Sequence, residues 1–249
     1  MKIVVIGGTG LIGRQVVALL SQAGHEAVAA SPSTGVDTLT GEGLAQALQG
    51  TDVVVDVSNA PSFDAGPALD FFTRSARHLS EAEHAAGVRH HVTLSIVGVD
   101  QVPDYGYYRA KVAQEEAARA SGIPCDIVRA TQFFEFIGPV MDMGTEGDEV
   151  RLPSTRLRPI ASADVAAAVA GTAQRRPLPG VLAVAGPQTY RLDRLAEITL
   201  EARPDGRRVV TDETAGLFAG MPEGVLTGDD TTHLAPTRYE DWLARQPRP

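Results

Sequence analysis

A tyrosine and a lysine lie four residues apart in the segment "GYYRAK", at Tyr107 and Lys111. On an α-helix, residues at this spacing share one face, so the two side chains can lie side by side. A phenol with an ordinary pKa of about 10 is a poor acid-base catalyst at neutral pH, but a nearby ammonium lowers that pKa. The neutral phenol can then deliver a proton to a carbonyl oxygen that receives a hydride. The pair predicts acid-base catalysis, and the alternative is a tyrosine that only lines a pocket or packs.

A serine lies twelve residues before Tyr107, at Ser95 in "VTLSIVG", near the carboxyl end of a predicted strand. In open parallel sheets, ligands bind off the carboxyl ends of the strands. We therefore expect Ser95 to face the same crevice as a cofactor, with its hydroxyl holding the oxygen of a substrate.

The segment "IVVIGGTGLIG" places four glycines between an apolar strand and an apolar-periodic helix. Gly8, Gly10 and Gly13 fit G-x-G-x-x-G, a pattern whose missing side chains allow a tight turn, close approach of a pyrophosphate and close helix packing. The helix N-terminus then receives the anion. The alternative is a plain tight turn. A nucleotide-triphosphate loop is rejected, because Arg14 and Gln15 replace its Lys and Ser or Thr. The expected cofactor-binding residues of this turn are Gly7, Gly8, Thr9, Gly10, Leu11, Ile12, Gly13 and Arg14.

The second predicted strand, in "EAVAASPSTG", ends in hydroxyl-bearing residues that include Ser31 and Ser33. NAD sites usually carry an Asp or Glu here for the ribose hydroxyls. Without that carboxylate, and with Arg14 nearby, the sequence favours NADP(H) over NAD(H). The alternative is that these hydroxyls only cap a turn.

Short apolar runs alternate with helical patterns through the first half of the chain, which predicts parallel βαβ units. The near-continuous Val and Ile runs indicate strands covered by helices on both faces. The expected class is therefore α/β, a Rossmann-type doubly wound parallel sheet with a small C-terminal substrate lobe. The expected helices of the first half are 11–23, 42–49, 66–86 and 105–121.

After residue 131 the alternation loosens into a strand at "DEVRLP", a helix at 162–174, a strand at "VLAVAG" and a helix at 191–202. No repeat or long linker separates this half from the first. We expect a single NAD(P)-binding domain over 1–249. Its dinucleotide-binding core is 1–131, and 132–249 is mainly the substrate-pocket lobe.

The chain resembles the short-chain dehydrogenase/reductase superfamily, in its atypical branch near the NmrA-like NAD(P)-binding proteins. The segments that carry the resemblance run through the first 136 residues, and the C-terminal half resembles the family only loosely. These segments are "GGTGLIG", "DVVVDVSNA", "LSIVGVD", "GYYRAKVAQEE" and "IVRATQFFEF".

The resemblance implies that Tyr107 is the general acid or base, that Lys111 holds the nicotinamide ribose and tunes Tyr107, and that Ser95 orients the substrate. The residues that it implies beside the cofactor are Ser58, Asn59, Ala60, Arg129, Ala130 and Thr131.

The chain departs from the family pattern at two positions. Phe72 stands where many members have an Asn, which weakens a proton relay through that position. Tyr108 is adjacent to Tyr107, but only Tyr107 has the four-residue relation to Lys111. In many NmrA-like proteins, moreover, the lysine persists for cofactor binding while the tyrosine does not act.

An aromatic and methionine-rich stretch follows the last strand of the first half. Such side chains form apolar, adaptable pockets, although core packing explains them equally well. A pocket of this kind suits flat apolar carbonyl compounds or quinones. The expected pocket residues are Phe133, Phe136, Met141 and Met143, and Phe134 and Ile137 belong to the same stretch.

The formal net charge of −9 disfavours nucleic acid or an anionic membrane as partner. A single cysteine, Cys125, cannot form an intrachain disulfide, and no apolar run approaches the length of a membrane span. We therefore expect a cytoplasmic protein.

Several other features are expected to do no chemistry. His90 and His91 point to opposite faces of a strand, and no histidines have metal-ligand spacing, so we expect no metal. Glu115 and Glu116 are expected on a solvated helix face. The segment around Trp242 predicts a C-terminal helix that docks an aromatic onto the core, the alternative being a self-association patch of a homodimer. Disorder is expected only at the terminal "RQPRP".

These expectations combine into an NADP-preferring oxidoreductase that transfers hydride to an apolar carbonyl or quinone. The alternative is a non-catalytic NAD(P)-binding redox sensor that changes its affinity for a partner.

Overall fold

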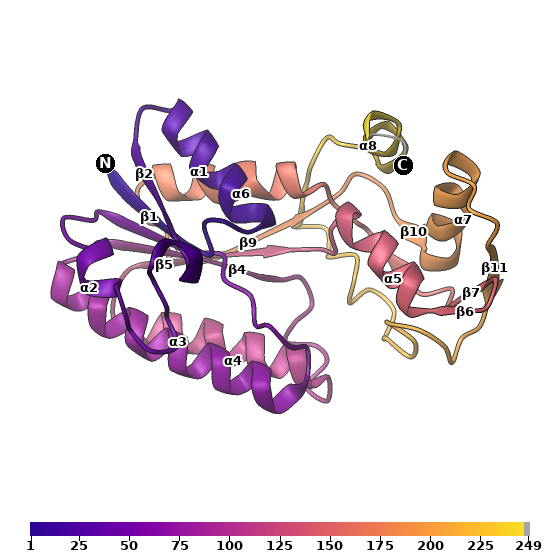
Figure 1. Cartoon of the computed structure of the whole chain (residues 1–249), viewed down its shortest axis with the longest axis horizontal. Helices are drawn as coiled ribbons and strands as arrows, with labels where there is room; N and C mark the ends of the chain where they lie inside the picture. The colour runs from indigo at the N-terminus through magenta and orange to yellow at the C-terminus, as the bar shows by residue number, and fades with distance from the viewer. Residues whose placement is uncertain (247–249) are drawn as a thin grey trace. The chain divides into compact units, whose positions relative to one another are not determined.

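The computed structural model describes residues 1–246, and these form an α/β fold with a central parallel sheet of seven strands (Figure 1). The chain divides into two compact units. Unit 1 comprises Met1–Arg129 and Val165–Leu182, and unit 2 comprises Ala130–Asp164 with the described residues from Ala183 on. The first unit thus includes a segment from the second half of the chain, Val165–Leu182.

The strands of the central sheet confirm the predicted doubly wound class. Their order across the sheet is β12-β9-β5-β4-β3-β1-β2. Buried Val and Ile residues fill the central strands, as expected when both faces are covered. The strands are β1 (Lys2–Ile6), β2 (Glu26–Ala30), β3 (Val53–Asp56), β4 (His90–Ile96), β5 (Cys125–Ala130), β9 (Gly180–Ala185) and β12 (His233–Leu234).

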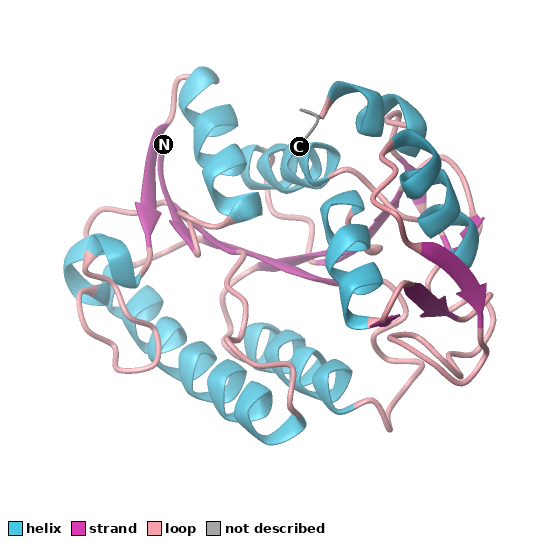
Figure 2. Ribbon diagram, turned by 45° about the vertical axis from the view of Figure 1, so that its right-hand side comes forward, coloured by secondary structure: helices cyan, strands magenta, loops and turns pink. Residues whose placement is uncertain are grey.

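Helices cover both faces of the sheet in unit 1: α1 and α6 lie on one face, and α3 and α4 lie side by side on the other (Figures 1 and 2). In α1 the buried residues Ile12, Val16 and Leu20 recur every four positions, so that one stripe faces the sheet. The bounds are α1 (Leu11–Gln22), α3 (Ala65–Ala86), α4 (Gly106–Ala120) and α6 (Ser162–Gln174), with a 3₁₀ turn η1 (Pro32–Thr34).

The expected helix at 42–49 is shorter in the structure, where α2 covers only Leu44–Ala47. Gly43 before it has φ of 74° and Gly50 after it has φ of 69°. Both are left-handed conformations that end helical backbone on either side.

The strand register brings three chain segments together at the carboxyl edge of the sheet. Ile6 at the end of β1 pairs with Ala30 at the end of β2 and with Asp56 at the end of β3. The next residues of each strand therefore emerge side by side, at the point where the strand order reverses. This is the place where ligands bind in open α/β sheets.

Unit 2 has its own small sheets and an aromatic core. Phe134 packs against Tyr239 and Trp242 with ring centroids 5.1 and 5.5 Å apart, which confirms that the C-terminal helix docks its aromatic side chains onto the core. The elements are η2 (Phe134–Phe136), α5 (Ile137–Met143), β6 (Thr145–Glu146), β7 (Glu149–Leu152), β8 (Arg156–Leu157), β10 (Tyr190–Arg191), α7 (Leu192–Ala202), β11 (Arg208–Thr211) and α8 (Tyr239–Arg245).

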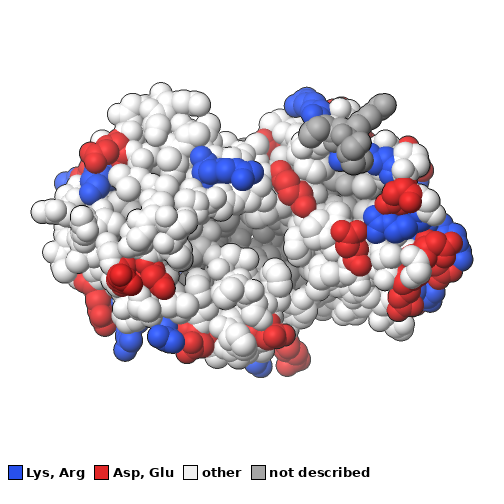
Figure 3. All heavy atoms as spheres, in the orientation of Figure 1, with Lys and Arg blue, Asp and Glu red and all other residues white. Residues whose placement is uncertain are grey.

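The two adjacent histidines have different partners, as predicted for opposite faces of a strand. His90 is hydrogen-bonded to Asp126 of β5 at 2.8 Å, and His91 is hydrogen-bonded to Glu83 of α3 at 2.7 Å. Within residues 1–246, no helix is long and apolar enough to cross a membrane. Figure 3 shows basic and acidic side chains interspersed on the visible face. The last three residues of the terminal "RQPRP" lie outside the described residues.

Candidate functional site

The glycine-rich turn follows β1 and is packed so tightly that side chains cannot enter it. Gly7 has φ of 75°, and a Cβ added to it would lie 2.9 Å from Val57 O. A Cβ on Gly8 would lie 2.6 Å from the Cα of Ala29, and one on Gly13 would lie 2.1 Å from Gly7 O. The turn thus seats α1 directly on the loop and the neighbouring strands, which leaves its backbone bare at the helix N-terminus. This is the arrangement that a pyrophosphate requires.

A cluster of hydroxyls lies beside this turn at the end of β2. Thr9 Oγ1 donates to Ser31 Oγ at 3.0 Å, and the Ser31 and Ser33 hydroxyls are 2.9 Å apart. Ser31 and Thr34 also form a capping box around η1, so the turn-capping alternative holds for these two residues. Ser33 and Arg14 are exposed, and Arg14 forms no ion pair with any described residue.

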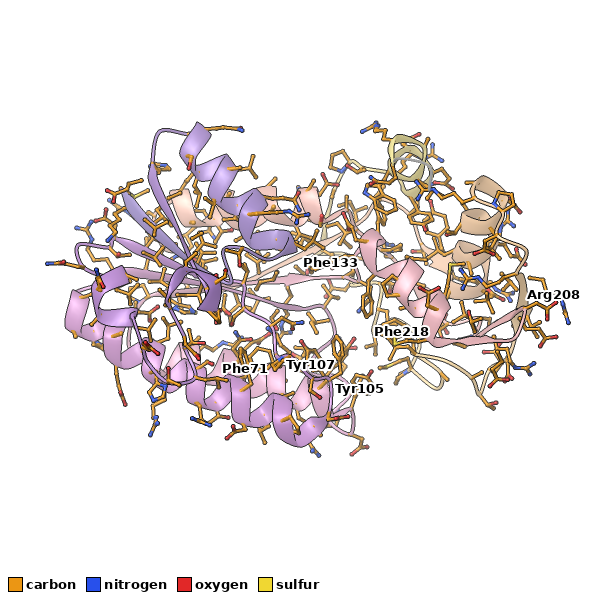
Figure 4. The ribbon with its side chains drawn as sticks, in the orientation of Figure 1. Phe71, Tyr105, Tyr107, Phe133, Arg208 and Phe218 are labelled. Carbon is orange, nitrogen blue, oxygen red and sulfur yellow. The ribbon has the colours of Figure 1, made fainter. Side chains whose placement is uncertain are left out.

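The Tyr107 side chain lies at the first turn of α4 and is directed at the loop after β3. Its hydroxyl donates a hydrogen bond to Asn59 Oδ1. Its ring, 8% exposed, packs against Phe63 with centroids 5.0 Å apart and against Phe72 at 6.2 Å. Figure 4 shows Tyr105 and Tyr107 at the start of α4, with Phe71 on the neighbouring α3.

The neighbouring Tyr108 is also buried but has a different environment. Its ring packs edge-on against Tyr105, with centroids 4.9 Å apart. The Tyr107 hydroxyl reaches the loop expected to line the cofactor through its hydrogen bond to Asn59.

The environment of Tyr107 does not lower the pKa of its phenol, contrary to the expectation from Lys111. Burial, with a smaller contribution from Tyr105, raises the pKa of Tyr107 to about 12. Desolvation disfavours the phenolate, and the contacts of the Lys111 ammonium are with other groups. In this structure the phenol is neutral and is a hydrogen-bond donor.

The Lys111 ammonium is buried, with the residue 4% exposed. It donates to Leu94 O at 2.8 Å and to Gln114 Oε1, and it lies 4.6 Å from the centroid of the Phe72 ring. No carboxylate among the described residues lies within ion-pair distance of it. Burial lowers the pKa of Lys111 to about 8, although Asp56 and Glu115 favour the charged form.

The Ser95 hydroxyl lies near the carboxyl end of β4 and is buried. Its Oγ has no hydrogen-bond partner among residues 1–246. A buried hydroxyl without a partner costs about 1–3 kcal/mol, so an orphan of this kind requires an explanation. Because Ser95 is only 3% exposed, its contact with a substrate oxygen stays a prediction.

The loop after β3 is held by the carboxylate of Asp56, a residue that was not predicted from the sequence. The backbone N–H of Ser58 donates to Asp56 Oδ1 at 3.0 Å, while Asn59 accepts from Tyr107 and Ala60 is buried. An Asp that closes an otherwise all-valine buried strand is the signal that could have identified it.

Two further residues of this region also escaped prediction. Gln114 lies 3% exposed, three positions after Lys111, and its Nε2 donates to Asp56 Oδ2 at 2.7 Å. Phe63 is 59% exposed although it is apolar, and its ring packs at a tilt against Tyr107. Helical spacing from Lys111 could have indicated Gln114, but nothing in the sequence marks Phe63.

The expectation of a solvated face at Glu115 is wrong, whereas Glu116 is exposed as expected. Glu115 is 1% exposed because Arg129 binds both of its oxygens, at 2.8 and 2.7 Å. Arg129 also pairs with Asp100 at 2.8 Å, and these partners, Glu115 foremost, raise the pKa of the guanidinium. The Arg129 side chain is thus engaged within unit 1, and its place beside the nicotinamide stays a prediction.

The remaining predicted residues belong to unit 2. Thr131 Oγ1 donates to Arg158 O at 2.6 Å, and Ala130 is buried. Met141 is buried, as are Phe134 and Ile137, which favours core packing for those three. Phe133 and Phe136 are half-buried and Met143 is 59% exposed, so these three are accessible to a ligand.

The comparisons with known proteins agree with this geometry. Residues 7–176 match the NAD(P)H-binding family. Over 145 residues the chain is 33% identical to (4-alkanoyl-5-oxo-2,5-dihydrofuran-3-yl)methyl phosphate reductase of Streptomyces griseus subsp. griseus, which covers 53% of this chain and 48% of that protein. Over 204 residues it is 31% identical to the chloroplastic divinyl chlorophyllide a 8-vinyl-reductase of Oryza sativa subsp. indica, which covers 68% and 50%. The chain spans about half the length of these curated relatives.

The fold is shared with a solved reductase. The structure of dTDP-4-dehydrorhamnose reductase from Bacillus anthracis str. Ames, in complex with NADP, superposes with a TM-score of 0.73. Sequence identity is 16%, and the match covers 98% of this chain and 97% of that one, so the likeness shows the fold. Because the family match extends over more than half of the chain, the protein belongs to the NAD(P)H-binding family.

Proposed function

We propose that this protein is an NADPH-dependent oxidoreductase of the atypical short-chain dehydrogenase/reductase kind, acting on an apolar carbonyl compound or quinone. The observation that carries the proposal is the hydrogen bond from Tyr107 to Asn59. This hydrogen bond connects the candidate acid Tyr107 to the loop after β3, which emerges beside the glycine-rich turn. The proposed proton donor and the proposed dinucleotide site therefore lie at the same edge of the sheet.

The protein's own residues have separate roles in this proposal. A nicotinamide cofactor, when bound, would supply the hydride. The bare backbone of the glycine-rich turn holds the pyrophosphate, and the Lys111 ammonium holds the nicotinamide ribose. Ser95 gives its hydroxyl to the substrate oxygen. Tyr107, neutral and already a donor, turns its proton from Asn59 to that oxygen as negative charge develops there.

The cofactor preference rests on charge at the end of β2. No carboxylate occurs among residues 31–36, which follow Ala30, and exposed Arg14 and Ser33 are available to a 2′-phosphate. A charge-assisted contact with Arg14 stabilises NADPH and gives nothing to NADH. We expect a lower dissociation constant for NADPH, and equal constants at moderate salt would contradict this preference.

The proposed substrate class rests on the aromatic side chains. Phe63, exposed beside Tyr107, offers a flat apolar surface next to the proton donor. Phe133, Phe136 and Met143 are the accessible members of the predicted pocket stretch, and the relatives in Streptomyces and rice are reductases by name. These features favour flat apolar carbonyl compounds and quinones.

The homodimer and the cytoplasmic location expected from the sequence stay predictions.

A second candidate function is a redox sensor of the NmrA-like type, which binds the cofactor without turnover. The raised pKa of Tyr107 favours it, because a buried phenol that resists ionisation can be purely structural. In that case the protein would bind NADPH and NADP with different affinities, and its affinity for a partner protein would depend on which of the two is bound.

The test is NADPH oxidation at 340 nm with a panel of quinones, ketones and aldehydes, run beside titrations of NADPH, NADH and NADP. Turnover on any member supports the oxidoreductase. Tight binding that discriminates NADPH from NADP, with no turnover on the panel, supports the sensor. No binding of any nicotinamide nucleotide would contradict both.

A further inference from the structure

A glutamine side chain links the buried lysine to a buried carboxylate. Gln114 accepts from the Lys111 ammonium through Oε1, and its Nε2 donates to Asp56 Oδ2 at 2.7 Å. All three residues are nearly inaccessible, with Lys111 at 4%, Gln114 at 3% and Asp56 at 6% exposed. The amide thus links the buried ammonium to the buried carboxylate through two hydrogen bonds.

The chemistry of the amide fixes its orientation. An ammonium can only donate and a carboxylate only accept, so the Gln114 carbonyl must face Lys111 and its NH₂ must face Asp56. Reversing the amide would place like partial charges at both contacts. A buried Gln is costly unless both ends are satisfied, and here each end meets a group of opposite polarity.

The link continues into the loop that holds Tyr107. The second carboxylate oxygen of Asp56 accepts the backbone N–H of Ser58, and the next residue, Asn59, accepts from Tyr107. Lys111 and Tyr107 share helix α4, and both are connected to the loop after β3. Tyr107 is connected to this loop through Asn59, and Lys111 is connected to it through Gln114 and Asp56.

We propose that Gln114 is a positioning residue, whose amide holds the Lys111 ammonium at Leu94 O and couples it to the charge of Asp56. The inference rests on the proposed function, in which Lys111 binds the nicotinamide ribose. Gln114 itself touches no reacting atom. Its effect is on where the ammonium lies and on how firmly it keeps its proton.

Several other charged groups surround this link. Glu115 lies on the same helix and also favours the charged form of Lys111, but its own ion pairs are with Arg129 and Arg119. His91 of β4 and Glu83 of α3 line a small cavity with Gln114 and Asp56, and they pair with each other at 2.7 Å. Asp56 is therefore the carboxylate that reaches Lys111 through a hydrogen-bonded partner.

The chain offers a direct measurement, because Lys2 and Lys111 are its only two lysines. With lysine labelled at the ε-carbon, an NMR titration of the full chain follows two signals, and Lys2→Arg assigns them. The ordinary lysine pKa is about 10.4. We expect Lys111 to titrate near pH 8, where burial places its pKa.

Two substitutions should move this titration in opposite directions. Gln114→Glu places a carboxylate against the ammonium and should raise the pKa of Lys111 by at least about one pH unit. Gln114→Met removes the link to Asp56 at similar volume and should lower it. Gln22→Glu, which adds the same charge at an exposed position of α1, should leave it unchanged.

An unchanged Lys111 titration in folded Gln114→Glu or in folded Gln114→Met protein overturns the proposal. Thermal melts report whether each variant folds. This readout needs no cofactor or substrate, so it decides the role of Gln114 even if the proposed oxidoreductase function fails.

The cofactor arm then tests the link to function. Loss of the Lys111 charge should weaken NADPH binding on the order of tenfold, the value of one charge-assisted hydrogen bond. In wild type this loss should follow the Lys111 titration above pH 8, and in Gln114→Glu it should move to higher pH with it. If the pH dependence of NADPH affinity stays the same in Gln114→Glu while the Lys111 pKa shifts, Gln114 has no role in cofactor binding.

Discussion

The Tyr107 hydroxyl is bonded to Asn59, and Lys111, one helical turn along, is bonded elsewhere. The two side chains on one face of α4 are therefore held by separate partners. Burial keeps the phenol neutral, and its hydrogen bond to Asn59 makes it a donor to the predicted cofactor loop. Lys111 is available for the ribose without being needed to ionise the phenol.

Replacing Tyr107 by Phe should keep NADPH binding and lower turnover on a carbonyl substrate at least about tenfold, because a positioned general acid contributes about 10²-fold or more. Titrations of NADPH and steady-state kinetics measure the two effects. Tyr108→Phe is the matched control, since its ring packs against Tyr105, and it should change turnover little. Unchanged turnover in Tyr107→Phe would indicate hydride transfer without a protein acid.

Glu115→Gln should lower the free energy of unfolding by at least about 2 kcal/mol, because it leaves the Arg129 guanidinium with only an exposed partner, Asp100. Glu116→Gln, at the next and exposed position, should change it by less than about 0.5 kcal/mol. Urea unfolding of both variants measures the difference. Equal stabilities would mean that Glu115 is not held as the structure places it.

Gly13→Ala should abolish NADPH binding or prevent folding, because the added Cβ would lie 2.1 Å from Gly7 O and push α1 off the turn. Gly171→Ala is the control, since Gly171 is exposed in α6 and nothing lies within 4 Å of its Cβ. That change should stabilise the protein by about 0.5–1 kcal/mol. Melting curves and NADPH titrations compare them, and normal binding by Gly13→Ala would contradict the packing of the turn.

The buried Lys111 predicts a rise of stability with pH. Its pKa is about 8 in the folded protein against 10.5 in an exposed lysine, so between these values the unfolded chain binds the extra proton. Stability therefore increases with pH across this window. From pH 7.5 to 9.5, wild type should gain about 1–2 kcal/mol relative to Lys111→Met. Urea unfolding at both values measures it, and a constant difference would show that Lys111 titrates normally.

Much of the sheet could be predicted because its signals are local. Val and Ile runs, the glycine-rich turn and the four-residue helical stripes each depend on neighbours in sequence. The same holds for the spacing of Tyr107 and Lys111. The bounds of the helix at 162–174 were predicted to the residue. That most of this helix belongs to unit 1 was not predicted, because tertiary packing decides which unit a helix packs in.

The errors came from partners distant in sequence. Glu115 looks solvated in "AQEEAARA" because its partner Arg129 is 14 residues away on a strand. The pKa of Tyr107 was expected to fall because spacing puts Lys111 nearby. Spacing does not reveal that Leu94 and Gln114 take up the ammonium. Asp56 was missed for the same reason, since its partner Gln114 is 58 residues away.

The most direct test of hydride transfer uses NADPH carrying deuterium at C4 of the nicotinamide, with the best acceptor from the panel. We predict that wild-type protein delivers deuterium from one face of the ring to the product, with one NADP formed per product reduced. A carbonyl acceptor keeps the label on carbon, whereas a quinone loses it to solvent and is judged by the stoichiometry. Tight NADPH binding with no acceptor reduced and no label transferred would contradict the account.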